Sequence, residues 1–90
     1  VIASNALRRL AIESKLTKET KKYFAKEEID QLRFFAEKFG AEPWIALRFL
    51  RDEWYFLRLD DLDKTGDNFV ISTELAKNKG MSFKSLISGF

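Results

Sequence analysis

The 90-residue sequence contains no cysteine and no histidine, and it has a single proline and four glycines. Without cysteine the chain can form neither disulfides nor thiolate metal sites. Without histidine it lacks the side chain that most often serves as a general base near neutral pH. Any catalysis must therefore use carboxylates, lysine, tyrosine or hydroxyl groups, and this favours a metal-assisted reaction.

Long apolar runs are also absent. No stretch approaches the roughly 20 residues that a bilayer-spanning helix needs, and no signal peptide is visible. We therefore expect a cytoplasmic protein with no membrane partner. Asparagine and glutamine are scarce, with four residues in total, whereas a third of the residues are charged. This balance is typical of proteins from thermophiles.

Apolar and aromatic side chains are abundant: 46% of the residues are hydrophobic, and nine are phenylalanine. Such a composition supports a folded core and argues against disorder. A chain of this length buries only about 60–65% of the surface that it exposes when unfolded, so its core has little margin. We expect a single domain over residues 1–90.

The net charge of +2 hides a strong asymmetry along the chain. Residues 1–26 carry seven basic and two acidic side chains, whereas residues 27–63 carry five basic and ten acidic ones. A cationic N-terminal region attracts polyanions, of which nucleic acid is the most abundant. The acidic middle predicts that only one face of the protein binds DNA.

The segment Leu10–Lys15 places a carboxylate and an amine on one side of an apolar strand. Side chains alternate along a strand, so Glu13 and Lys15 share a face, and Ser14 takes the other. Their Cα atoms would lie about 6.6 Å apart, close enough for both polar tips to reach one ligand. The carboxylate can bind a hard divalent cation, and the lysine can orient water or balance a phosphate. Such pairs also occur on ordinary exposed strands, so the pattern alone does not define an active site.

The N-terminal third is predicted to form strands around a tight turn. Apolar alternation favours strands at Val1–Ser4 and Leu7–Lys15, joined by a turn at Asn5–Ala6. The basic segment Leu16–Lys22 is predicted as a loop, and Tyr23–Phe24 as a brief addition to the sheet.

The segment Lys26–Phe39 is predicted as an amphipathic helix. Its apolar residues recur at spacings of three and four, at Ile29, Leu32, Phe35, Ala36 and Phe39. Two glutamates in the first turn and Lys38 in the last suit the helix dipole, and Gly40 permits a left-handed stop.

The C-terminal half is predicted to contain a hairpin, one more strand and a short helix. The elements are strands at Trp44–Leu50, Trp54–Leu59 and Phe69–Ile71, and a helix at Phe83–Ser88 between a Ser82 cap and Gly89. The order predicts a mixed α/β fold with a mainly antiparallel β-sheet, one long helix and a short C-terminal helix.

Other clusters have an ordinary interpretation beside a functional one. Asp60–Asp67 lacks the acidic ladder of an EF-hand loop and is predicted as a solvated turn. Gln31 could reach the Glu13 site from the helix, or could be a plain surface residue. Aromatic residues could stack on bases, although on a hairpin they more often form core or subunit contacts, at Trp44, Phe49, Trp54, Tyr55 and Phe56.

Taken together, these segments resemble one family. Leu10–Lys15 and the strand before it resemble the Glu-x-Lys half of the Asp…Glu-x-Lys nucleases. The run Leu32–Leu50 is similar to archaeal Holliday junction resolvases, in which a helix ends in Phe-Gly-Gly or Phe-Gly-Ala. In the resolvases that helix is followed by an apolar strand with a basic residue before Phe-Leu. In this sequence Arg48 precedes Phe49 and Leu50 in the same way. The resemblance covers nearly the whole chain and implies a restriction-endonuclease-like nuclease fold.

The sequence also departs from that family. The resolvases carry an N-terminal helix with a Glu and an Arg, a basic loop, and an Asp directly before the strand that begins here at Val1. We therefore expect an N-terminally truncated nuclease domain. The resemblance implies that the missing Asp, Glu13 and the Ser14 carbonyl bind Mg²⁺ or Mn²⁺, and that Lys15 orients the attacking water. Without the Asp we expect weak metal binding and impaired cleavage.

The function implied by the resemblance is cleavage of four-way (Holliday) junctions by a structure-selective endonuclease in DNA recombination and repair. The predicted DNA contacts are Lys18, Lys21, Lys22 and Arg48. Such enzymes act as homodimers. We expect a dimer or higher homo-oligomer here, because exposed apolar surface is predicted at Phe34, Trp44, Phe49, Trp54 and Phe56. Two alternatives stay open: a non-enzymatic assembly or DNA-binding module with the same fold, and a DNA-end exonuclease of the same superfamily.

Overall fold

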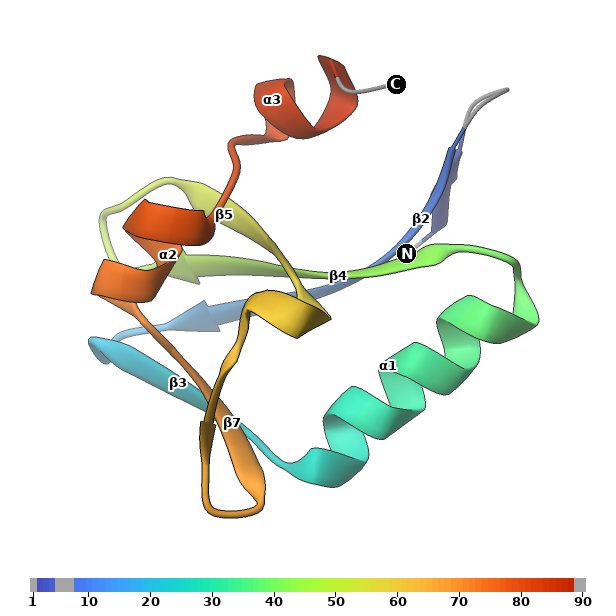
Figure 1. Cartoon of the computed structure of the whole chain (residues 1–90). Helices are drawn as coiled ribbons and strands as arrows, with labels where there is room; N and C mark the ends of the chain where they lie inside the picture. The colour runs from blue at the N-terminus through green and yellow to red at the C-terminus, as the bar shows by residue number, and fades with distance from the viewer. Residues whose placement is uncertain (1, 5–7, 89–90) are drawn as a thin grey trace.

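The computed structural model describes residues 2–4 and 8–88, which form two β-sheets and three α-helices (Figure 1). The larger sheet has the strand order β1-β2-β4-β5. Its strands are β1 (Ile2–Ser4), β2 (Arg9–Thr17), β4 (Glu42–Phe49) and β5 (Trp54–Arg58). The two central strands, β2 and β4, are parallel, and each edge strand is antiparallel to its neighbour. Leu10–Ile12 of β2 and Trp44–Leu47 of β4 are apolar and buried, because both faces of the sheet are covered there.

The parallel pair exists because a helix connects the two strands. The chain leaves β2, passes through β3 (Lys21–Phe24) and the helix α1 (Lys26–Lys38), and returns along β4 (Figure 1). Three side chains of the predicted apolar stripe are buried beneath the helix, Ile29, Leu32 and Ala36. Gly40 has a φ of +61°, the left-handed conformation predicted for it after the helix.

A second sheet has the order β3-β7-β6 and is antiparallel throughout. Its other strands are β6 (Asp63–Thr65) and β7 (Asn68–Ser72). The predicted pairing of Tyr23–Phe24 is therefore present, but it lies in this separate sheet. The loop prediction for Leu16–Lys22 is wrong at both ends. The strand β2 continues to Thr17 because its pairing with β4 runs that far, and β3 begins at Lys21.

Three further elements were not predicted. The acidic segment contains a 3-10 turn, η1 (Leu59–Asp61), followed by β6, so it is a structured connection. A helix α2 (Thr73–Lys79) follows β7, with the Ser72 hydroxyl accepting a hydrogen bond from the Leu75 amide at 3.0 Å. The last helix, α3 (Phe83–Ser88), has the predicted bounds, and Ser82 Oγ accepts from the Ser85 amide at 3.1 Å.

The alternation of β2 divides the core in two. Ala11 joins the cluster beneath α1, whereas Leu10 and Ile12 join a second cluster beneath α3. The mixed α/β fold with mainly antiparallel pairing is confirmed. Val1, the predicted turn at Asn5–Ala6 and the predicted stop at Gly89 lie outside the described residues. In the described part of the chain, no helix is both long enough and apolar enough to cross a membrane.

Candidate active site

The Glu13 and Lys15 side chains lie on the face of β2 that α1 covers. Lys15 Nζ is 3.7 Å from Glu13 Oε1, so the two groups form an ion pair, as their spacing of two residues predicted. About half of the Glu13 side chain and a third of the Lys15 side chain are exposed. The pair is therefore accessible to a ligand while its backbone is fixed between paired strands.

A third charged residue, Glu28 in the first turn of α1, contacts the same lysine. Its Oε2 is 3.8 Å from Lys15 Nζ. Its Oε1 accepts a hydrogen bond from the Ala25 amide at 3.3 Å, which is the capping-box arrangement at a helix start. In the sequence, Glu28 stands out only as one of two first-turn acids that suit the helix dipole. Its place on the same helix face as Gln31, three residues later, was the signal that could have identified it.

A pocket of about 290 Å³ lies beside Glu13, between β2 and α1. Its lining residues are Ile12, Glu13, Gln31, Leu32 and Phe35. Gln31 therefore does lie beside the candidate site. Charged and amide groups meet apolar side chains here, so the pocket presents a polar edge over an apolar floor.

The oxygens that could bind a metal at this site are the Glu13 carboxylate and the Ser14 carbonyl. In β2 the Thr17 carbonyl accepts a hydrogen bond from the Leu50 amide, which follows β4. Carbonyls alternate in direction along a strand, so the Ser14 carbonyl points away from β4, toward the edge of β2 that pairs with β1. The described pairing with β1 ends at Ala11 and does not include Ser14. Hard oxygens suit Mg²⁺ or Mn²⁺. The described residues contain no group of three or more metal-ligating side chains, so these donors alone fall short of a complete site.

The predicted DNA-contact residues fall in two places. Lys18, Lys21 and Lys22 lie at the turn from β2 into β3, with the first two exposed. Arg48 lies on the opposite face of the larger sheet from Glu13, because it pairs in register with Leu16 and not with an odd-numbered neighbour. Its Nε donates to the Asp52 carbonyl at 3.0 Å.

The predicted interface aromatics are mostly internal. Trp44, Phe49 and Phe56 are buried against this chain's own core, where Trp44 is 1% exposed. The prediction that these three side chains form a subunit interface is therefore wrong. Phe49 lies in the core cluster beneath α1, and Trp44 and Phe56 lie in the cluster beneath α3. Phe34 and Trp54 are exposed, the former on α1 and the latter on the α3 side of the sheet.

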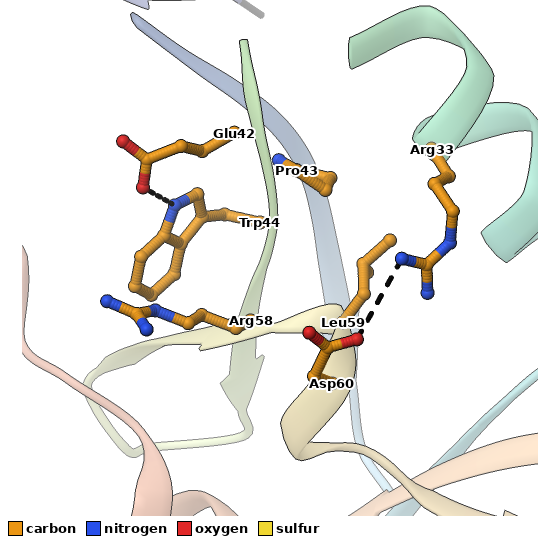
Figure 2. Close-up of a pocket in the computed structure, with 7 residues that line it drawn as sticks. All are labelled: Arg33, Glu42, Pro43, Trp44, Arg58, Leu59 and Asp60. Carbon is orange, nitrogen blue, oxygen red and sulfur yellow. Dashed lines mark hydrogen bonds and ion pairs between the residues drawn. The ribbon is translucent and has the colours of Figure 1, made fainter. Parts of the chain in front are cut away.

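A second polar pocket, of about 280 Å³, lies at the start of β4 (Figure 2). The Arg58 guanidinium lies over the Trp44 ring, 5.3 Å from its centre, and the Trp44 Nε1 donates to Glu42 Oε1 at 3.4 Å. Arg8 donates two hydrogen bonds of 2.8 Å to the Glu42 carboxylate. These bonds hold the pKa of Glu42 below its ordinary value. These contacts join Arg8, the residue before β2, to side chains of β4 and β5, and they do not involve Glu13.

The fold and its central Glu-x-Lys strand define the class of protein: the chain has a restriction-endonuclease-like fold. The chain belongs to the archaeal Holliday junction resolvase (Hjc) family, which it matches over residues 1–90.

Similar proteins support this assignment. The chain is 41% identical over 71 residues to the crossover junction endodeoxyribonuclease Hjc of Archaeoglobus fulgidus, covering 79% of this chain and 52% of that protein. It is 36% identical over 66 residues to Hjc of Methanocaldococcus jannaschii, covering 73% and 49% of the two chains. The solved structure of A. fulgidus Hjc, a Holliday junction resolvase from an archaeal hyperthermophile, superposes with a TM-score of 0.89 at 35% identity. That match covers 99% of this chain and 72% of the other. The chain thus spans about half the length of the curated relatives that it matches.

Proposed function

We propose that this chain is a nuclease domain of a structure-selective DNA endonuclease that cuts four-way junctions by metal-assisted phosphodiester hydrolysis. The observation that carries the proposal is the Glu13–Lys15 ion pair at 3.7 Å, on the solvent-accessible stretch of β2 that follows the buried residues Leu10–Ile12. An acid and an amine so placed, in a chain of the Hjc family, support attack of water on a phosphodiester.

The roles follow from the chemistry of each group. Glu13 and the Ser14 carbonyl would hold Mg²⁺ or Mn²⁺ together with further oxygens. A bound divalent ion lowers the pKa of water and offsets charge on the scissile phosphate. Lys15 holds a positive charge beside Glu13 and can orient water or a phosphate oxygen through its three N–H donors.

DNA would be held by phosphate contacts from basic side chains. Lys18, Lys21 and Lys22 continue from the strand that carries Glu13, so they can contact the backbone next to the scissile phosphate. Arg48, on the other face of the sheet, would contact a different arm or strand of a branched substrate. Contacts on two faces suit branched DNA better than a single straight duplex.

Self-association is part of the proposal. Helix α1 and its C-cap residue expose three phenylalanines: Phe34 by 70%, Phe35 by 39% and Phe39 by 43%, and the last two rings are 4.8 Å apart. A phenylalanine as exposed as Phe34, with two more partly exposed phenylalanines on the same element, suits a two-fold contact between copies. We propose a homodimer through this α1 surface.

Binding and cleavage of matched DNA substrates test the function. A four-way junction and a linear duplex with the same arm sequences are each incubated with the chain in Mg²⁺. We expect tighter binding to the junction, and weak cleavage that Glu13→Gln abolishes. Equal affinity for both substrates, or cleavage unaffected by Glu13→Gln, would contradict the proposal.

A further inference from the structure

The arrangement around Lys15 raises a question of charge. Glu13 and Lys15 alone form a neutral pair, and a lysine bound to a single carboxylate competes with any cation for that carboxylate. A divalent cation needs negative charge at its site. A site built only from this pair would therefore oppose the binding of its own metal.

Glu28 changes that balance. The Lys15 ammonium lies between two carboxylates at nearly equal distances, 3.7 Å from Glu13 and 3.8 Å from Glu28. With both acids present, the three side chains carry a net charge of −1. Lys15 can then remain ion-paired with Glu28 when Glu13 binds a cation.

The position of Glu28 is fixed by the fold of the helix start. One of its oxygens accepts from the Ala25 amide, which leaves the other directed at Lys15. Ala25 itself provides no side-chain cap, so the helix start depends on this glutamate. The same carboxylate thus begins α1 and contacts the lysine of β2.

We propose that Glu28 is a positioning residue of the nuclease site: it shares the Lys15 ammonium with Glu13 and so keeps the Glu13 carboxylate available to a divalent cation. The inference rests on the proposed function, since it gives Glu28 a role only if Glu13 binds metal. It assigns the acid from α1 to the site without making it a metal ligand.

The chain offers a matched pair of variants for the test. Glu28→Gln removes the charge but keeps a side-chain oxygen for the Ala25 amide, because glutamine also serves at this position of a capping box. Glu27→Gln removes a neighbouring first-turn charge, and Glu27 forms no ion pair within the described residues. Both variants should unfold within a few degrees of the unmodified chain.

The experiment measures Mn²⁺ affinity by water-proton relaxation and observes the Lys15 ammonium by ¹⁵N NMR. For Glu28→Gln we expect Mn²⁺ affinity to fall about 3- to 5-fold, as loss of one nearby unit charge in a solvated site implies. We also expect a shifted Lys15 signal. Glu27→Gln should lower Mn²⁺ affinity by less than half of the fold-change seen for Glu28→Gln. It should leave the chemical shift of the Lys15 ammonium unchanged.

Three results decide between the claims. An unchanged Lys15 signal in Glu28→Gln, or equal effects of the two variants, would overturn the role of Glu28 while leaving the site intact. In that case Glu13→Gln would still abolish Mn²⁺ binding. If Glu13→Gln leaves Mn²⁺ binding unchanged, the proposed function itself fails.

Discussion

The two faces of the larger sheet carry different chemistry, although the same strands build both. The face under α1 presents Glu13, Lys15 and Glu28 around a pocket with a polar edge. The face under α3 presents an apolar groove of about 490 Å³, lined by Ile12, Ser14, Ala46, Trp54, Phe56 and Phe83. The difference arises from one-residue alternation along β2, so a single register shift would exchange the charged site for a serine and two apolar residues.

The largest expected difference in activity is between substitutions of two adjacent residues, Glu13 and Ser14, whose side chains lie on opposite faces of the sheet. Glu13→Gln removes the only carboxylate of β2 and should lower junction cleavage and Mn²⁺ binding by at least about 100-fold, the scale of losing a group that stabilises the transition state. Ser14→Ala should change both by less than about 2-fold, because only its carbonyl is assigned a role. Isothermal titration and gel-based cleavage measure the two. A severe loss of cleavage or Mn²⁺ binding in Ser14→Ala would instead place the reaction on the face under α3.

The next comparison concerns which face associates with a second copy. Phe34→Glu puts a charge into the exposed surface of α1 and should convert the proposed dimer into a 10.5 kDa monomer in analytical ultracentrifugation. Trp54→Glu, on the α3 side, should leave the dimer intact. Dissociation by Trp54→Glu alone would move the interface to the other face.

A smaller effect is expected when the basic residues of either face are substituted, and it is measured as the salt dependence of DNA affinity. If Lys18, Lys21, Lys22 and Arg48 each neutralise a phosphate, the logarithm of affinity should fall against the logarithm of salt concentration with a slope of about −3 to −4. Lys21→Ala and Arg48→Ala should each reduce that slope by about one. Fluorescence anisotropy at several salt concentrations provides the slopes. Affinity that does not respond to salt would remove DNA from the proposal.

The smallest expected effect concerns the Arg8–Glu42 ion pair on the α3 side. Because its arginine partner lowers the pKa of folded Glu42, the ion pair stabilises the fold above the ordinary glutamate pKa of 4.5. That stability is lost as pH falls below this value. The side chain is 42% exposed, so the contribution should be no more than about 1 kcal/mol. Urea unfolding between pH 7 and pH 3 should show a shallower acid-side decline in Glu42→Gln. An identical decline would show that other carboxylates account for it.

Much of this arrangement could be predicted where the pattern is long. The 13-residue helix α1 repeats its apolar spacing over three turns, and the alternation of β2 correctly placed Glu13 and Lys15 together. The seven-residue helix α2 and the three-residue strand β6 were missed because such short elements span no more than about two periods of a pattern.

Other features depend on tertiary packing and leave no local signal. Phe35 and Phe39 belong to the helix stripe, yet they are 39% and 43% exposed, and Phe35 borders the open pocket beside Glu13. The tryptophan at position 44 looks like a surface aromatic on a hairpin, but α3 and Arg58 cover it. The approach of Glu28 to Lys15 joins a helix to a strand 13 positions away, and neither the helical nor the strand periodicity of the sequence indicates that contact.

Paramagnetic NMR tests directly whether the α1 face of β2 binds the metal, as we propose for the site that cuts DNA. Mn²⁺ added to ¹⁵N-labelled chain broadens the amide signals nearest the bound ion. We expect broadening first at Glu13, Ser14 and Lys15, and its loss in Glu13→Gln. Broadening centred on Glu42 and Asp60, in the pocket at the start of β4, would contradict it.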